Sequence, residues 1–265
     1  MQRDVSCRIA LTVTEPADLV FAVAVSAGTS SDPESLTITL DGAPVEVREL
    51  ADAHGTRLHR VRAGSGALVL EYAATVTGHG ATAEATDTDL LTYTRPSRYA
   101  ESDELAPTAH AEFAGIDDSA ALLAAVSSWV GTHLSYVPGS SLPTDGATRT
   151  LLARQGVCRD YAHLVVALLR GLGIPARVVA VYAPGLDPMD FHAVAEAWVD
   201  GAWRVVDATT LAPRTTLVRI ATGRDAADTA FLNVMSGRAD LVSVEVGAVA
   251  DVLPNDDLTQ LVQIG

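Results

Sequence analysis

The chain has 265 residues, of which 48% are hydrophobic and 19% charged, and this is typical of a soluble globular protein with one large domain or two modest ones. Its charge is lopsided, because 33 acidic residues outnumber 18 basic ones, all arginine, for a net charge of −15. The lack of lysine excludes a P-loop lysine, a lysine Schiff base and a Ser–Lys dyad. The acidic balance argues against a nucleic-acid partner, which needs a cationic surface, and favours a role in solubility.

Cysteine content and the start of the chain bear on the compartment. The two cysteines, Cys7 and Cys158, lie far apart, whereas a secreted disulfide scaffold carries more cysteines in a shorter chain. The first residues lack the basic start and apolar stretch of a signal peptide. Arg170 interrupts the longest apolar run before it reaches the roughly 18 residues of a membrane span. We therefore expect a cytoplasmic protein with reduced thiols and no membrane partner.

The first eighty residues are predicted to be all β. Short runs of alternating or β-branched residues are separated by Gly, Pro, Asp and Ser, and they cover 6–14, 19–26, 36–40, 45–50, 57–61 and 67–77. Asp41-Gly42 favours a type I′ hairpin turn, because this dipeptide tolerates positive φ angles. These strands and turns predict a small all-β sandwich as the N-terminal domain, residues 1–80.

The rest of the chain is predicted to form a second, mixed domain. Residues 81–115, rich in Ala, Thr, Asp and Pro, are expected to connect the two domains, so that the second covers 116–265. Apolar residues at spacings of three and four predict a helix over 117–130. An amphipathic helix of three to four turns is expected to follow Cys158, and a strand is expected over 241–249.

Two strands after the second helix bring together a histidine and an aspartate. They cover 192–199 and 203–208, and Asp200-Gly201 joins them. If this dipeptide is a two-residue turn, His192 and Asp207 lie on the same face as diagonal neighbours, roughly 7–8 Å apart at the backbone. The carboxylate can then hold one imidazole nitrogen and leave the other free to deprotonate a thiol.

Cys158 is the candidate for that thiol. It lies at the predicted N-terminus of its helix, where the helix dipole and unpaired backbone N–H groups favour a thiolate. Arg159 adds positive charge and Asp160 opposes it, so the sequence leaves the net effect open. Taken alone, Cys158 could be an inert buried cysteine. Together with a histidine and an aspartate on adjacent strands, it has the layout of a papain-type site.

The same residues resemble those of bacterial transglutaminase-like proteins. The strict match lies within 151–211, and its runs are Gly156–Leu164, Gly173–Arg177, Phe191–Ala193, Ala197–Val199 and Trp203–Thr209. Three flanking runs also resemble one bacterial branch of the family, which often carries a β-rich N-terminal domain: 95–99, 136–141 and 223–228. The resemblance implies an α+β fold, with a papain/transglutaminase-like core in which the helix bearing the cysteine packs on an antiparallel sheet.

The resemblance also implies the role of each site residue. Cys158 would be the nucleophile, His192 the general base and acid, and Asp207 the orienting group. The backbone N–H of Cys158 is expected to contribute to an oxyanion hole, with Gln155 or Tyr136 as the second donor. Many relatives have serine and proline where this chain has Phe191 and Ala208, and both changes could reshape the acyl pocket.

These expectations define a cysteine-dependent enzyme that attacks an amide bond through a thioester acyl-enzyme. Water as acceptor would make it a peptidase or amidase, and an amine would make it an acyl transferase, because the two share the first half-reaction. The substrate is expected to be a peptide, a protein or a small amide. The alternative is a non-catalytic two-domain binding or assembly module that keeps the triad as a scaffold. The sequence gives no signal for an oligomeric state.

Other polar residues have simpler explanations than a ligand site. Cys158 and His163 lie about 140° apart on one helix, which is wrong for a single metal ion, so His163 is expected to be structural. Residues 187–190 lack the alternating oxygen ligands of a calcium loop. Arg159, Arg177 and Glu196 could touch substrate, but charged residues at the rim of a core element are more often solvated or paired. No cofactor or metal is therefore expected.

Overall fold

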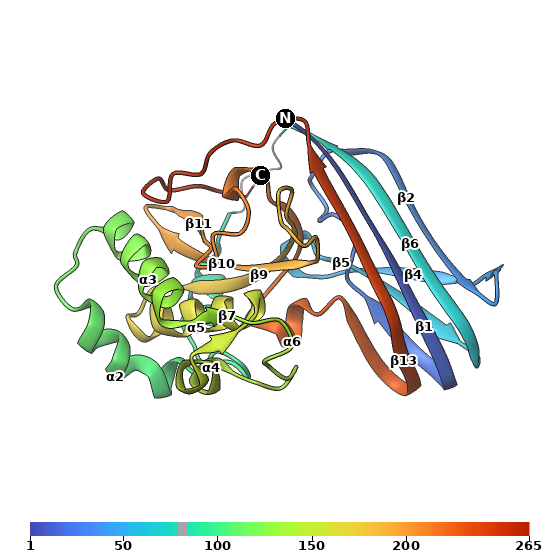
Figure 1. Ribbon diagram of the computed structural model, residues 1–265, viewed down its shortest axis with the longest axis horizontal. Coiled ribbons are helices and arrows are strands. Elements are labelled where there is room, and N and C mark those ends of the chain that lie inside the picture. Colours follow the sequence, from blue (N-terminus) through green and yellow to red (C-terminus); the bar gives the residue numbers. More distant parts are fainter. Residues whose placement is uncertain (79–83, 265) are drawn as a thin grey trace.

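The chain folds into a helix-rich core on one side and a long-stranded β-sheet on the other (Figure 1). The computed structural model describes residues 1–78 and 84–264, so residues 81–83, at the start of the predicted connecting segment, lie outside the described residues. Within these two ranges, no helix is long and apolar enough to cross a membrane.

The long-stranded sheet is built around β1 (Gln2–Phe21). The other strands are β2 (Ser31–Leu40), β3 (Ala43–Pro44), β4 (Val47–Ala51), β5 (Arg57–Ala63), β6 (Gly66–Thr77) and β13 (Leu232–Ala250). Their order is β3-β2-β6-β1-β5-β4, with β13 paired to the other edge of β1. The first half of β1 pairs with β6 and its second half with β5, so one long strand joins the two parts of the sheet.

The N-terminal part of the chain is rich in β-strands, as predicted, but its strands differ from the predicted ones in extent and arrangement. Two strands predicted on either side of Pro16 form one strand, β1, because the irregularities of register around Glu15 absorb the break. The strands form one continuous seven-stranded sheet rather than two stacked sheets, and residues 232–250 complete it. β13 covers an edge of β1 that would otherwise expose unpaired backbone groups. The predicted turn is confirmed, since Asp41 and Gly42 have φ angles of 51° and 80°.

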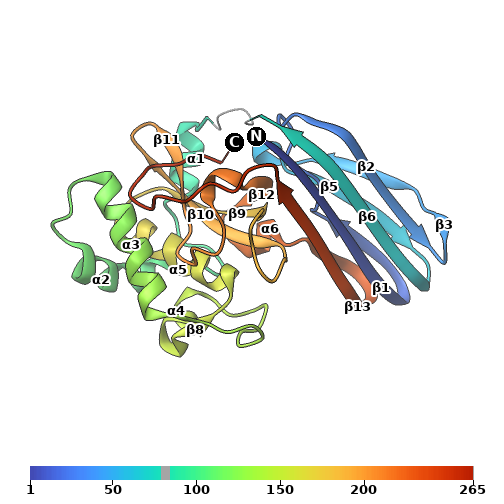
Figure 2. The same ribbon diagram turned by 45° about the horizontal axis from the view of Figure 1, so that its top comes forward.

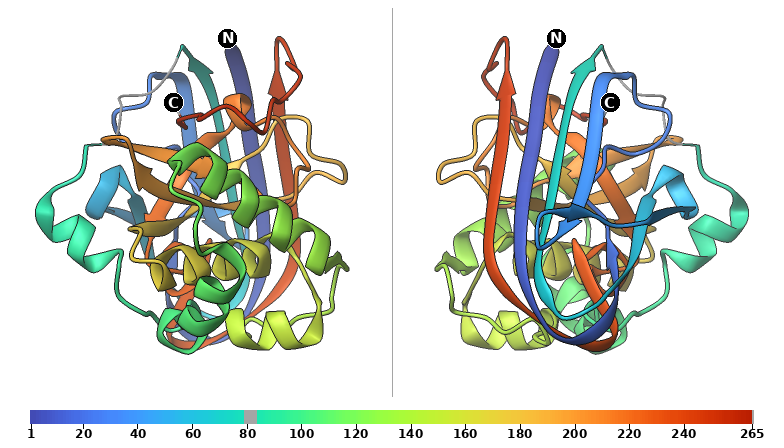
Figure 3. Two further views of the ribbon diagram at one scale, coloured as in Figure 1. Left: turned by 90° about the vertical axis from the view of Figure 1, so that its left-hand side faces the viewer. Right: turned by 90° about the vertical axis from the view of Figure 1, so that its right-hand side faces the viewer.

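The core contains a second, four-stranded sheet in the order β11-β10-β9-β12, with antiparallel neighbours. Its strands are β9 (Ala176–Tyr182), β10 (His192–Val199), β11 (Ala202–Val206) and β12 (Val218–Gly223). The remaining elements are η1 (Ala53–Gly55), α1 (Asp87–Thr92), α2 (Ser102–Phe113), α3 (Ser119–His133), β7 (Ser135–Tyr136), α4 (Ala147–Ala153), β8 (Gln155–Gly156), α5 (Cys158–Gly171), η2 (Arg214–Thr216) and α6 (Ala226–Thr229). Helices α2, α3 and α4 lie on the side of the core away from the long-stranded sheet (Figures 1 and 3).

Helix α5 is the central element of the core. Every residue from 160 to 170 is buried, and its apolar side chains pack together with those of α2, α3, β9 and β10. Arg170, which breaks the apolar pattern in the sequence, donates its buried guanidinium hydrogens to the carbonyls of Ala176, Arg95 and Arg224 at 2.7–3.0 Å. Arg170 thereby ties the C-terminal end of α5 to three other segments of the core.

The two sheets meet through shared apolar packing. Tyr182 of β9 donates a hydrogen bond to the Val23 carbonyl at 2.8 Å, and Phe191 stacks on Phe231 with ring centroids 5.4 Å apart. After β13 the chain returns over the core, so that its last residues lie close to the N-terminus (Figure 2). This returning segment, 251–264, ends with Ile264 buried against the core.

Candidate active site

Cys158 is the first residue of α5 and is partly exposed. The short parallel pair of β7 and β8 holds the chain just before it, with Tyr136 opposite Gly156. A side chain at Gly156 would lie 2.7 Å from the Cβ of Asp160, so only glycine allows this close turn into the helix. Local backbone geometry therefore presents the thiol at the helix N-terminus, as the sequence predicts.

Asp160, whose effect on Cys158 the sequence leaves open, is held by several donors. Its buried carboxylate accepts hydrogen bonds from the Val157 backbone N–H at 2.8 Å and the Ser141 hydroxyl at 2.5 Å. The Arg159 guanidinium also pairs with it at 3.0 Å. Arg159 and Asp160 thus largely neutralise each other, and the carboxylate serves to cap the first turn of α5.

The strands β10 and β11 bring His192 and Asp207 into contact. Ala195 pairs with Val206, which is the register that a two-residue turn predicts. His192 Nε2 lies 2.8 Å from Asp207 Oδ2, and both side chains are buried. The other carboxylate oxygen of Asp207 accepts hydrogen bonds from the Thr209 N–H and hydroxyl at 2.9 and 2.7 Å. Asp207 is therefore fixed on one side by Thr209 and orients the imidazole on the other.

The protonation of this pair follows from its surroundings. Burial alone would lower the pKa of His192, but the Asp207 carboxylate and the nearby Cys158 side chain outweigh burial and raise that pKa to about 10. Burial alone would raise the pKa of Asp207, yet His192 and Thr209 hold it below its ordinary value. Nδ1 of His192 is buried and has no hydrogen-bond partner among the described residues. Nδ1 of His192 is therefore available to interact with the Cys158 thiol. The raised pKa means that the imidazole favours its protonated form.

Of the two candidate oxyanion donors, Tyr136 is the one that contacts Cys158. Burial, together with the charge of the neighbouring Cys158, raises the pKa of the Tyr136 hydroxyl to about 12. The phenol is therefore protonated at neutral pH and able to donate. Gln155 lies on β8 with an exposed side chain, three residues before the nucleophile.

The residues that sequence reasoning discounts have structural roles. His163 is fully buried, its Nε2 accepts a hydrogen bond from the Ala226 N–H at 3.0 Å, and burial lowers its pKa to about 4. Arg177 and Glu196 pair with each other at 2.7 Å inside the core. Cys7 is packed in the long-stranded sheet, and burial raises the pKa of its thiol to about 11. These four side chains are therefore buried in the interior of the fold.

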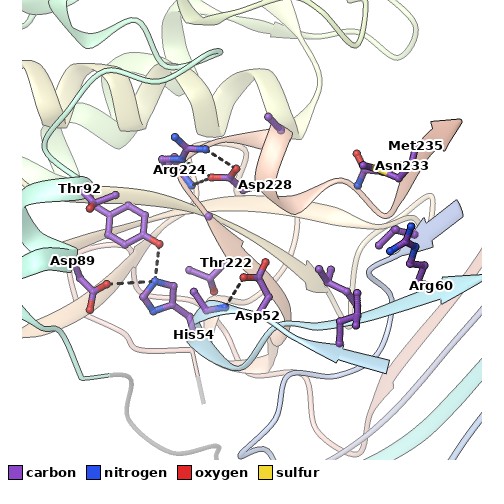
Figure 4. Close-up of a pocket in the computed structure, with 17 residues that line it drawn as sticks. Asp52, His54, Arg60, Asp89, Thr92, Thr222, Arg224, Asp228, Asn233 and Met235 are labelled. Carbon is purple, nitrogen blue, oxygen red and sulfur yellow. Dashed lines mark hydrogen bonds and ion pairs between the residues drawn. The ribbon is translucent and has the colours of Figure 1, made fainter. Parts of the chain in front are cut away.

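Two cavities could be associated with a ligand. The larger, of about 660 Å³, lies between η1, α1 and the segment around α6 (Figure 4). Its polar groups are engaged with one another, since His54 is hydrogen-bonded to Tyr93 at 2.7 Å and Arg224 pairs with Asp228 at 2.8 Å. None of Cys158, His192 and Asp207 lines it. This cavity is therefore separate from the candidate site.

The second cavity, a cleft of about 550 Å³, borders the candidate site. Tyr136 and Thr209 both line it, and these residues contact Cys158 and Asp207, respectively. Ala208 lines the same cleft, whereas Phe191 packs between the two sheets. Of the two departures from the family pattern, Ala208 alone is therefore a wall of this cleft.

Sequence reasoning did not single out Thr209 or the returning segment 251–264. Thr209 stands in the run that carries the family resemblance, so its place two residues after Asp207 was a usable signal. Leu258 and Thr259 of the returning segment line the cleft. Nothing local in the sequence pointed to them, because their position depends on how the chain crosses back from β13.

Comparison with known proteins places this geometry in a family. The family model of the transglutaminase-like superfamily matches residues 107–208, a span that contains Cys158, His192 and Asp207. The crystal structure of a protein from Cytophaga hutchinsonii, described as a candidate cysteine protease, is 34% identical and aligns over 98% of this chain and 96% of that one, with a TM-score of 0.90. The chain belongs to the transglutaminase-like superfamily. The predicted family and α+β fold are thus confirmed, and they support a cysteine-based enzyme family.

The curated relatives of this chain match it only in part. An uncharacterised protein of Mycobacterium leprae is 33% identical over 138 residues, which are 48% of this chain and 50% of that protein. An uncharacterised protein of Mycobacterium tuberculosis is 38% identical over 82 residues, 28% of this chain and 26% of that protein. The chain thus matches half or less of the length of these relatives.

Proposed function

We propose that this transglutaminase-like protein is a cysteine-dependent amide-bond enzyme, with Cys158 as nucleophile, His192 as general base and acid, and Asp207 as orienting group. The observation that carries the proposal is the state of His192. One nitrogen is held by Asp207 at 2.8 Å, and the other is buried beside Cys158 without another partner among the described residues. This is the arrangement that lets an imidazole exchange a proton with a thiol.

The proposed reaction has two half-reactions. Before the substrate reacts, the proton of Cys158 has already passed to His192, and the thiolate then attacks the amide carbonyl carbon. The C–N bond then breaks, His192 gives its proton to the departing amine, and a thioester remains on Cys158. In the second half-reaction His192 takes a proton from water, hydroxide adds to the thioester carbon, and the thiol leaves with that proton. The products of hydrolysis are a carboxylic acid and an amine.

The negative charge on the carbonyl oxygen needs donors in the transition state. The backbone N–H of Cys158 and the hydroxyl of Tyr136 are the two donors we propose, because Tyr136 already contacts Cys158 and stays protonated at neutral pH. A preorganised donor of this kind is worth about 10²–10³ in rate in a comparable site.

The molecule that accepts the acyl group from the thioester determines whether the enzyme is a peptidase or amidase, or an acyl transferase. An amine acceptor would use the same first half-reaction, so the proposal covers both, with water as the default acceptor. If amines are acceptors, the chain has no lysine of its own to modify. The predicted cytoplasmic location remains a part of this proposal.

Alkylation of Cys158 tests whether the site is catalytic or a non-catalytic scaffold. Because its raised pKa keeps His192 charged through neutral pH, an imidazolium lies beside the Cys158 sulfur and favours its alkylation there. We expect iodoacetamide to modify Cys158 at least about tenfold faster than a model thiol at about pH 6, where an ordinary thiol with a pKa of about 8.5 is almost fully protonated. Asp207→Asn should remove most of this advantage, because it removes the group that keeps His192 charged.

The control for alkylation is Cys158→Ala, which reports the background from Cys7. Burial raises the pKa of the Cys7 thiol, so this background should be slow. A Cys158 thiol that reacts no faster than the model thiol across the pH range would favour the scaffold.

A further inference from the structure

The cleft beside the proposed site contains no formal charge. All thirteen of its lining residues are Ala, Gly, Ser, Thr, Leu or Tyr. In a chain with 19% charged residues and a net charge of −15, two or three charged side chains would be expected in a set of that size. The cleft thus differs from the rest of this acidic surface, and from the larger cavity, which holds paired carboxylates and guanidinium groups.

One wall of the cleft comes from helix α3 and the turn after β11. Ser128 and Thr132 of α3 line it, and the Thr132 hydroxyl donates to the Ser128 carbonyl at 2.8 Å, so that its methyl group is left for apolar contact. A side chain at Gly131 would lie 2.7 Å from the Ala208 carbonyl oxygen. The absence of a side chain at Gly131 lets α3 pack closely against the turn after β11, and this contact fixes the position of both elements in the wall.

Another wall is the returning segment 251–264, which supplies Leu258 and Thr259. The segment is anchored to the core by Arg214, whose guanidinium pairs with Asp256 at 2.9 and 3.1 Å. Its end is fixed by the Val205 N–H, which donates to the Val262 carbonyl at 2.8 Å. Figure 2 shows this segment crossing the core after β13. Anchors on both sides of Leu258 make it a wall of the cleft rather than a loose tail.

A cleft of this composition selects by charge. Its hydroxyl groups and apolar surfaces can contact an uncharged side chain, but the lining offers no counter-ion. A charged side chain would lose hydration there without gaining an ion pair, which is costly. Carboxylates would in addition be repelled by the net negative charge of the chain.

We propose that this cleft binds an uncharged side chain of a peptide substrate, next to the amide that Cys158 attacks, and that Ser128 and Leu258 determine this specificity. The inference rests on the proposed function, because Tyr136 and Thr209 connect the cleft to the triad. It narrows the substrate class from amides in general to peptides with a neutral residue at the reacting position.

The test uses a set of blocked peptides that differ at one residue beside the amide: Gln, Leu, Thr, Asp, Glu and Arg. Binding is measured to Cys158→Ala, which cannot form a thioester, and turnover is measured with the unmodified protein. Ser128→Asp and Leu258→Asp, each on the Cys158→Ala background, introduce a carboxylate from two different elements of the lining. Ala111→Asp, an exposed position of α2 outside the cleft, adds the same charge as a control. Circular dichroism confirms that each variant is folded.

We expect neutral peptides to bind Cys158→Ala at least about tenfold more tightly than charged ones. Ser128→Asp and Leu258→Asp should each shift the ratio of Arg to Gln binding toward Arg by about tenfold, and Ala111→Asp should not. Equal binding of charged and neutral peptides, no binding of any peptide, or an equal shift in Ala111→Asp would overturn the inference. Selective binding without turnover by the unmodified protein would contradict the proposed function and leave the cleft assignment standing.

Discussion

Replacing Cys158 by alanine is expected to reduce kcat/KM for peptide and amide substrates by about 10⁴-fold or more. The reason is that no other side chain in the site can form the acyl bond. His192 is engaged with Asp207 and is buried, and Tyr136 stays protonated because its pKa is raised to about 12. Release of the amine product, followed over time, measures the effect. Binding of the neutral peptides should persist in this variant, since the cleft itself is unchanged.

The chain offers a matched control in its other cysteine. Cys7 is buried in the long-stranded sheet, so Cys7→Ala removes a thiol of the same chemistry without touching the site. Turnover by Cys7→Ala should remain close to that of the unmodified protein. Turnover that survives in Cys158→Ala, or that is lost equally in both variants, would show that the nucleophile is wrongly assigned.

The largest expected effect on stability belongs to Glu196. Its carboxylate is fully buried between Arg177, at 2.7 Å, and Arg219, at 2.6 Å. The Arg177 guanidinium also lies 3.8 Å above the ring of Trp203. Glu196→Ala leaves two guanidinium groups in the core without their shared carboxylate, so we expect a loss of about 3–5 kcal/mol in the free energy of unfolding. Chemical denaturation measures it directly.

The control for Glu196 is an exposed pair of the same kind. Glu71 and Arg8 lie 3.4 Å apart on the surface, with 62% and 43% of their side chains exposed. Glu71→Ala should cost less than about 1 kcal/mol, because solvent screens the pair. A Glu196→Ala variant that is as stable as Glu71→Ala would contradict the structural role given to the buried cluster.

The ion cluster also has a pH dependence of defined sign. Burial alone would raise the pKa of Glu196, but Arg219 and Arg177 outweigh burial and lower it to about 2. Because the folded-state pKa lies below the unfolded value, the cluster contributes its full stability above about pH 4.3 and loses it as the pH falls toward 2. The free energy of unfolding of Glu196→Ala, measured as the pH falls from about 4.3 toward 2, should therefore lack the decrease that comes from protonation of Glu196.

The sequence predicted the contact between His192 and Asp207 because local signals fix the strands that carry them. Asp200 and Gly201 have φ angles of 50° and 70°, as a type I′ turn requires, so the register of β10 on β11 follows from two residues. The glycine-led helix start at Cys158 is likewise a short-range pattern. What the spacing could not decide was the choice between Tyr136 and Gln155, because it depends on the tertiary pairing of β7 with β8.

Long-range features escaped prediction for a related reason. The alternating pattern of β13 marks it as a strand, but nothing in that pattern names β1, more than 200 residues earlier, as its partner. The sequence analysis therefore placed this strand in the second domain, whereas it pairs with β1 of the long-stranded sheet. The path of residues 251–264 depends in turn on that pairing and on the Arg214–Asp256 contact. The sequence alone therefore could not predict that residues 251–264 form the wall that we expect to determine specificity.

The most direct test of the central claim is the mass of a trapped intermediate. The protein is mixed with the set of blocked peptides and the reaction is quenched in acid. The mass of the intact protein is measured, and the protein is then cleaved after arginine. Since Arg154 and Arg159 flank the nucleophile, the fragment Gln155–Arg159 carries Cys158 alone. The predicted result is that this fragment gains the mass of one acyl group, and that Cys158→Ala gains none. Turnover of peptides with an adduct on another residue, or with an adduct that persists in Cys158→Ala, would contradict the proposed mechanism.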